Sequence, residues 1–324
     1  MFGSLLSALA WFHQFSDPLA WLVLATFLTG TLLARYDEDL SERVFVLAWG
    51  TFAAFWFTLM HFYLFEQKSI IEGLGSVVAV PASLYVAYLL WNGRSSLTVL
   101  SRAVAVMGLI YFPFETLAVL RRPLVELVTR QVEFLLSLLG YHPQVINGSS
   151  ELLPLDVDPY RNTFFFEQEG NHRITYTILL ACTGLGSMSI FAGLVAAVRA
   201  PLRRKLRAAA IALPVIYALN LVRNVFIAVS FGYQKLHVFP DVIMGLFALD
   251  DPYTVSYYLA DRILAQSMSV VALVVITFLV VRELPEILDV IEELLFMVTG
   301  TEYDLRTELD VDAPPVRADG EGRR

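Results

Sequence analysis

Three side chains inside apolar stretches of the chain could together perform acyl-transfer chemistry. Cys182 is the only cysteine among 324 residues, so it can form no intrachain disulfide, but its thiolate could act as a nucleophile. Arg223 and Arg262 lie in the next two apolar stretches. Arginine stays protonated in proteins and cannot serve as the base, but it can stabilise a thiolate and donate hydrogen bonds to an oxyanion.

Each of these residues also has a simpler explanation. A lone cysteine in a membrane helix is usually a small apolar residue that fills space. An arginine near a helix end can extend its guanidinium to the membrane surface. A charged residue at the centre of a membrane helix costs about 2.5–3.5 kcal/mol of insertion free energy. Two such arginines in neighbouring stretches therefore favour a functional role.

The composition indicates a membrane protein. The chain is 57% hydrophobic with a mean hydropathy of +0.62, whereas soluble domains have about 45–50% apolar residues. The excess lies in stretches of about 20 residues, enough to cross a hydrocarbon core about 30 Å thick. We predict an all-α integral membrane protein, a polytopic bundle of about seven transmembrane helices plus amphipathic helices, with spans at residues 18–34, 44–65, 70–91, 99–120, 174–198, 209–231 and 255–281.

These elements predict four regions along the chain. An N-terminal membrane bundle of four spans is followed by an extracellular segment, which starts with an amphipathic helix near residues 123–139 and then shows β-like composition. A catalytic membrane bundle of three spans precedes an acidic cytoplasmic tail. The predicted bounds of the four regions are 1–120, 121–173, 174–282 and 283–324.

The acidic tail accounts for the charge of the whole chain. It holds twelve acidic residues and four arginines, which equals the net charge of −8. The rest of the chain is nearly neutral, so no nucleic acid partner is predicted. The single cysteine excludes a cysteine-rich metal site, and no metal or cofactor is predicted.

The basic residues of the short loops indicate the orientation. They favour an outside N-terminus and a cytoplasmic Arg199–Arg207 turn. Cys182, Arg223 and Arg262 then share a depth roughly 10–12 Å below the outer boundary, at about 1.5 Å per helical residue. This predicts a multi-pass protein of the cytoplasmic membrane with its active site toward the extracellular side. The histidines on that side, His61, His172 and His237, are candidate proton acceptors.

Polar or small residues accompany each of the three candidates. Asn220 and Asn224 lie within one helical turn of Arg223, and Gln266 lies one turn after Arg262. Gly184 and Ser187 closely follow Cys182. We predict that these five residues support the site or bind its substrate.

Three short motifs resemble the exosortase/archaeosortase family. They are Ala181–Ser187 (ACTGLGS), Asn220–Asn224 (NLVRN) and Asp261-Arg262. The third motif has an arginine where bacterial exosortases have histidine. In this respect the chain is similar to the archaeosortases of haloarchaea. The resemblance implies that Cys182 is the nucleophile of a membrane-embedded transpeptidase and that Arg223 and Arg262 assist it.

The resemblance also implies the partners. The substrates would be secreted proteins with a C-terminal signal, composed of a short motif (Pro-Gly-Phe, the PGF-CTERM type), a transmembrane helix and a basic tail. The enzyme would remove that signal and promote attachment of the new C-terminus to a prenyl-derived lipid acceptor of the membrane. S-layer glycoproteins are typical clients of the family.

Two other classes of protein remain open. In a membrane transporter or receptor, the intramembrane arginines would bind an anionic solute. A transporter needs a path to both sides of the membrane, whereas the polar intramembrane residues cluster toward one side. A structural scaffold is the second alternative.

Overall fold

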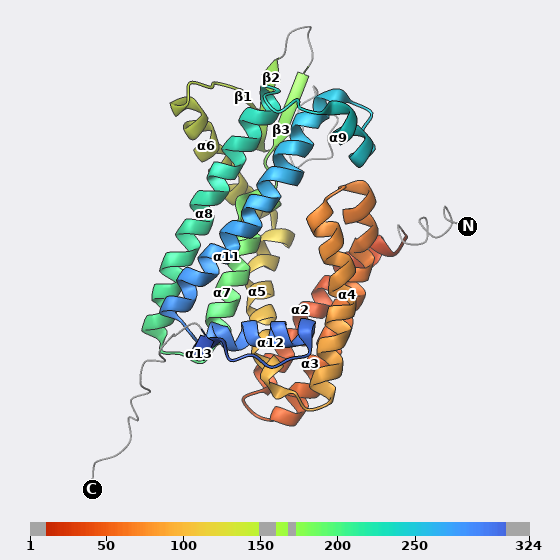
Figure 1. Ribbon diagram of the computed structural model, residues 1–324, viewed down its shortest axis with the longest axis vertical. Helices are drawn as coiled ribbons and strands as arrows, with labels where there is room; N and C mark the ends of the chain where they lie inside the picture. The colour runs from red at the N-terminus through yellow and green to blue at the C-terminus, as the bar shows by residue number, and fades with distance from the viewer. Residues whose placement is uncertain (1–10, 149–159, 168–172, 309–324) are drawn as a thin grey trace.

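The computed structural model describes residues 11–148, 160–167 and 173–308, and these ranges are mainly helical (Figure 1). His172, residues 1–10 and residues 309–324 of the acidic tail lie outside them. The helices are α2 Ser16–Leu33, α3 Glu38–His61, α4 Ile70–Trp91, α5 Thr98–Thr116, α6 Ala118–Leu138, α7 Leu185–Ala197, α8 Leu202–Gly232, α9 Pro240–Phe247, α10 Val255–Tyr257, α11 Gln266–Glu283, α12 Ile287–Thr299 and α13 Leu305–Glu308.

Six helical segments in the described ranges are long and apolar enough to cross a membrane. Only 17–33% of the residues in their apolar windows are buried inside the protein. Such apolar outer surfaces are stable where they face lipid rather than water. The prediction of an all-α, multi-pass membrane protein is confirmed, and about seven spans agrees approximately with the six segments His13–Leu33, Glu38–Glu66, Ile70–Trp91, Ser95–Thr116, Leu202–Gly232 and Pro252–Glu283.

The predicted fifth span differs from the structure. Residues 174–198 do not form one helix, because strand β3 occupies Arg173–Thr177 and a 3₁₀ turn occupies Leu180–Thr183 before α7 begins. The strand shows a two-residue burial pattern, in which Ile174 and Tyr176 are buried, as expected for a β-strand. The 13 residues of α7 are about 20 Å long at 1.5 Å per residue, which is shorter than the hydrocarbon core.

A small antiparallel sheet covers one end of the bundle. Its strands β1 Gln144–Asn147, β2 Arg161–Glu167 and β3 Arg173–Thr177 pair in the order β1-β2-β3. The amphipathic helix predicted near residues 123–139 is α6, which packs on β2. The sheet shares its core with α6 and α8 through a cluster that includes Val128, Val132, Phe164, Tyr176 and Ile227. This core fixes the position of β3, and β3 leads directly to Cys182.

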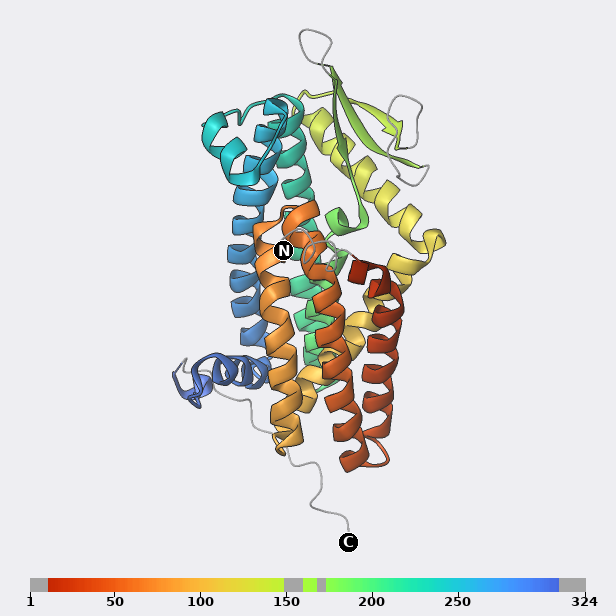
Figure 2. The ribbon, with the colours of Figure 1, turned by 90° about the vertical axis from the view of Figure 1, so that its right-hand side faces the viewer.

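Helices α2, α3 and α4 lie side by side on one flank, and α7, α8 and α11 form the other (Figures 1 and 2). At the sheet end, two hydrogen bonds join the flanks: Lys68 Nζ donates to the carbonyl of Ala248 at 2.8 Å and Gln266 Nε2 donates to Ser69 Oγ at 2.9 Å. At the opposite end, α12 crosses below the bundle (Figure 1), where Arg94 of the α4–α5 loop pairs with Glu293 at 2.7 Å.

Candidate active site

Cys182 lies in the 3₁₀ turn between β3 and α7, and its backbone is held on both sides. Its carbonyl oxygen accepts hydrogen bonds from Asn220 Nδ2 at 2.7 Å and Asn224 Nδ2 at 2.8 Å. Its N–H donates to the carbonyl of Leu179 at 2.9 Å. The thiol is therefore presented by a fixed turn at the start of a helix. Cys182 does not lie eight residues inside a helix, as the predicted span implied.

Asn224 connects the three elements that meet at this turn. Its Nδ2 donates both to Cys182 and to the carbonyl of Asn220, at 2.8 Å each. Its Oδ1 accepts a hydrogen bond from the hydroxyl of Tyr176 at 2.8 Å. Burial is the main cause that raises the pKa of Tyr176 well above its usual value, so the phenol stays protonated and can donate. The two predicted asparagines thus position the backbone of Cys182.

Gly184 allows the turn to approach α8. Its φ of +77° is a left-handed conformation that favours glycine. A Cβ atom at this position would lie 3.0 Å from both Cβ and Cγ of Asn220. Gly184 was predicted to support the site, and its role in the structure is to let Asn220 reach Cys182.

A comparison of two glycines tests this role. Gly184→Ala should cost about 1–2 kcal/mol from the left-handed backbone and should also displace Asn220 from Cys182. Gly140 is the matched control, because its φ is +82° and no atom lies within 4 Å of a Cβ built there. Thermal unfolding and the rate of maleimide labelling at Cys182 measure the two effects. We expect both variants to lose stability, but only Gly184→Ala to change the labelling rate; equal rates would contradict the packing role.

Arg223 lies one helical turn after Asn220 on α8, since residues three apart are neighbours on a helix. Its Nη2 donates to Asp261 Oδ1 at 2.7 Å. The Asp261 side chain is only 8% exposed, so its carboxylate needs a cationic partner. Arg223 Nε, also buried, has no hydrogen-bond acceptor within the described residues and can donate to a further group.

Arg262 lies on the other side of Asp261, in the π-helical segment Tyr258–Ala265 that precedes α11. Its Nε is 3.6 Å from Asp261 Oδ2, and its Nη1 is 3.8 Å from Glu72 Oε2 of α4. These are ion-pair distances longer than a hydrogen bond. Inserted π-turns occur frequently at functional sites, and this one places two oppositely charged neighbours, Asp261 and Arg262, in the same buried region.

The structure brings the three predicted principal residues into one electrostatic environment. Burial raises the pKa of the Cys182 thiol, the nearby charges of Arg223 and Arg262 act to lower it, and that of Asp261 acts to raise it. Asp261 was quoted as part of a motif but was not predicted to be a site residue. The sequence does contain a feature that could have identified Asp261. A carboxylate inside an apolar span is costly unless it is paired, and Asp261 adjoins Arg262 in the chain.

The remaining predicted residues have different surroundings. Ser187 lies in the first turn of α7, and the peptide N–H groups of a first helical turn have no acceptor within their own helix. Gln266 bonds to Ser69, the N-terminal cap of α4, so it links the flanks. His61 lies 3.2 Å from Glu66, and His237 is exposed after α8. Over the described ranges, no group of three potential metal-binding His, Cys, Asp or Glu residues occurs.

Comparisons with known proteins agree with the motifs. The family described as Transmembrane exosortase (Exosortase_EpsH) matches residues 9–250, a range that includes Cys182 and Arg223. Archaeosortase A of Haloferax volcanii is 51% identical over 307 residues, which cover 92% of this chain and 98% of that protein. Archaeosortase A of Natronomonas pharaonis is 42% identical over 309 residues, 93% and 95% of the two chains. No solved structure matches. With identities of this size over nearly its whole length, the chain belongs to the exosortase/archaeosortase family.

Proposed function

We propose that this protein is a membrane-embedded cysteine transpeptidase that removes the C-terminal sorting signal of secreted proteins. The observation that carries the proposal is the face of α8 that holds Asn220, Arg223 and Asn224. The two asparagines fix the backbone of Cys182, and the positive charge of Arg223 opposes the rise in the pKa of the thiol that burial causes. Relatives named archaeosortase A, a sortase by name, cover nearly the whole chain and support the same activity.

In the proposed reaction, the thiolate of Cys182 attacks the carbonyl carbon of the client's scissile peptide bond. A bond forms between Sγ and that carbon, and the carbonyl oxygen becomes an oxyanion. Arg223 and the N–H groups of Gly186 and Ser187 at the start of α7 are the available donors to it. The oxyanion then re-forms the carbonyl and the C–N bond breaks, the leaving amine takes up one proton, equivalent to the one that the thiol lost when it became the thiolate, and a thioester to Cys182 remains. A nucleophilic group of the acceptor attacks the thioester and releases the thiolate.

The family resemblance supplies the finer terms of the proposal. The client signal is of the PGF-CTERM type, S-layer glycoprotein is a representative client, and the acceptor is a prenyl-derived membrane lipid. The transporter alternative requires arginines that are free to bind a solute anion. Arg223 instead bonds to Asp261, and Arg262 lies between Asp261 and Glu72, which favours the catalytic interpretation.

Trapping the acyl-enzyme tests the function directly. Purified protein in detergent, without lipid acceptor, is mixed with a soluble reporter fused to a client signal and stopped with acid. Mass spectrometry should find the reporter's new C-terminus on the peptide that contains Cys182. Hydroxylamine should release it, because thioesters react with this nucleophile. Signal removal without an adduct at Cys182 in any time point would contradict covalent catalysis by this residue.

The proposed location is the cytoplasmic membrane, with the site facing the exterior, and cysteine labelling tests this topology. In a Cys182→Ala background, a single cysteine is placed at His142 or at Arg203, both of which are exposed. A membrane-impermeant maleimide added to intact cells should label position 142 and should reach position 203 only after lysis. Labelling of both positions in intact cells would refute the orientation.

A further inference from the structure

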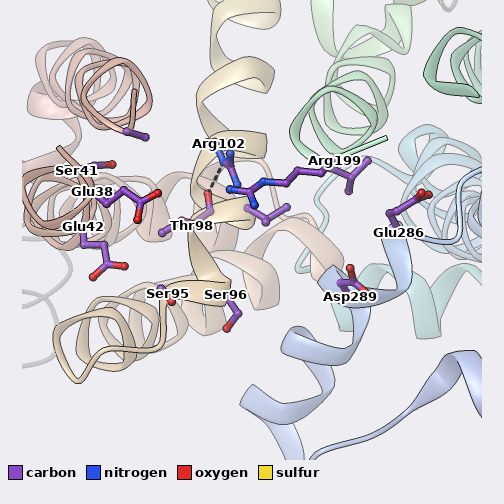
Figure 3. Close-up of a pocket in the computed structure, with 13 residues that line it drawn as sticks. Glu38, Ser41, Glu42, Ser95, Ser96, Thr98, Arg102, Arg199, Glu286 and Asp289 are labelled. Carbon is purple, nitrogen blue, oxygen red and sulfur yellow. Dashed lines mark hydrogen bonds between the residues drawn. The ribbon is translucent and has the colours of Figure 1, made fainter. Parts of the chain in front are cut away.

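A second polar cavity lies at the end of the bundle opposite Cys182. It has a volume of about 450 Å³ and is lined from α3, the α4–α5 connection, α5, the α7–α8 turn and α12 (Figure 3). This volume is in the range of small-molecule sites. Helix α7, about 20 Å long, separates this end from the Cys182 turn, so the cavity is distinct from the candidate active site.

Two arginines of the cavity lack an acidic partner. Arg102 of α5 and Arg199 of the α7–α8 turn form no ion pair with any carboxylate in the described ranges, and Arg102 Nε donates only to the carbonyl of Thr98 at 3.3 Å. Other arginines at this end are paired with α12, since Arg204 bonds to Glu286 at 2.7 Å and Arg306 to Asp289 at 2.6 Å. The acidic residues of α12 that line the cavity are therefore already neutralised.

The two unpaired guanidinium groups lie side by side in the cavity (Figure 3). The charge of Arg199 acts directly on Arg102, and the charge of Arg102 acts on Lys205 of α8. Like charges brought together raise the free energy of the folded chain unless an anion lies between them. Glu38 and Glu42 line the wall that α3 provides, and their negative charge lowers the affinity of the cavity for an anion, so a bound anion must contact the arginines directly.

We infer that Arg102 and Arg199 form a binding site for a phosphate-bearing ligand. Paired guanidinium groups match phosphate oxygens in geometry and charge. The cavity lies where α5 and α8 begin and α7 ends, at the level where spanning helices leave the hydrocarbon core. Basic pockets between membrane helices at that level bind lipid headgroups. A phospholipid headgroup and free inorganic phosphate share this chemistry, and the experiment separates these two sources.

Binding to the full-length protein in detergent tests the site. The probes are phosphatidic acid, the diacylglycerol with the same acyl chains, and sodium phosphate, followed by native mass spectrometry and by the shift of the unfolding temperature. Wild-type protein should prefer phosphatidic acid to diacylglycerol by about tenfold or more, as expected for charge-assisted contacts. Binding of sodium phosphate as tight as that of phosphatidic acid would identify a soluble anion as the ligand. Binding of phosphatidic acid alone would identify a lipid, and either result supports the site.

The variants decide whether the two arginines form it. Arg102→Gln/Arg199→Gln should lose the preference for phosphatidic acid. Arg203→Gln is the matched control, because Arg203 is an exposed arginine of the same basic turn that does not line the cavity, and it should keep the preference. If the double variant does not fold, each single variant should weaken binding several-fold. A folded double variant or folded single variants with wild-type preference would overturn the inference, as would an equal loss in Arg203→Gln.

Discussion

Replacing Cys182 with alanine should abolish client processing while the protein still inserts and folds. Removal of a covalent nucleophile can cost on the order of 10⁶ in rate, which is below the detection limit of a processing assay. The fold should survive because the recorded hydrogen bonds of Cys182 all use its backbone N–H and carbonyl, which alanine retains. Processing is measured by the size of a tagged client in cells and by the change in its electrophoretic mobility on lipid attachment. Folding is measured by the unfolding temperature of the purified variant.

Ser187→Ala is the matched control for this experiment. It removes one side-chain heavy atom in the next turn of the chain, and the reaction is proposed to use only the peptide N–H of Ser187. We expect Ser187→Ala to process the client at a rate near that of the wild type. A well-folded Cys182→Ala variant that processes the client would eliminate the thiol mechanism. The transporter alternative gives the thiol no role, so it predicts that Cys182→Ala is nearly silent and that substitution of Arg223 or Arg262 changes solute affinity.

The second large effect is expected at Arg223. Lysine keeps the positive charge but loses the planar, two-pronged donor geometry, so Arg223→Lys should be slower by about 10²–10³, the usual cost of one oxyanion donor. Arg223→Ala should be nearly inactive. At Arg262, lysine or histidine should retain some turnover, because its two carboxylate partners lie at 3.6 and 3.8 Å, too far for tight hydrogen bonds. Client processing rates in the four variants measure this ranking.

The contact between Arg223 and Asp261 requires a further control. Arg223→Ala removes the hydrogen-bonded partner of a buried carboxylate, which can cost about 3–5 kcal/mol of stability, and less here because Arg262 remains 3.6 Å from Asp261 and the Arg223 side chain is 26% exposed. Adding Asp261→Asn removes that charge. The double variant should therefore recover stability but not activity. Recovery of both would show that Arg223 contributes only to folding, and the catalytic role would be wrong.

The sequence predicted the helices with strong hydrophobic patterns well. The span predicted at residues 70–91 coincides with α4, Ile70–Trp91, because a capping serine precedes it and an apolar run fills it. The amphipathic helix predicted near residues 123–139 corresponds to α6. Composition and hydrophobic period were sufficient to predict these helices. Contact with lipid favours a continuous apolar run, and contact with the protein core on one side favours a single apolar face.

The main error lies in the segment that carries Cys182, the proposed nucleophile. An apolar stretch that begins at Ile174 reads as a span by composition alone, although its first residues alternate in burial and belong to β3. Strand pairing with β2 depends on residues that are distant in sequence, and a left-handed glycine is not visible in a hydropathy profile. Asp261 was missed for a related reason, because only the folded π-turn shows that one carboxylate faces both arginines.

The hydrogen bonds at Cys182 also have a consequence for biosynthesis. The amides that hold its carbonyl come 38 and 42 residues later in the chain, and Asp261 follows Arg223 by another 38. At a synthesis rate of about 5–20 residues per second, several seconds separate the appearance of the thiol from that of its supports. During this interval the nascent chain holds an unsupported cysteine. The proposed activity should therefore appear only after the last spanning segment, Pro252–Glu283, has been inserted.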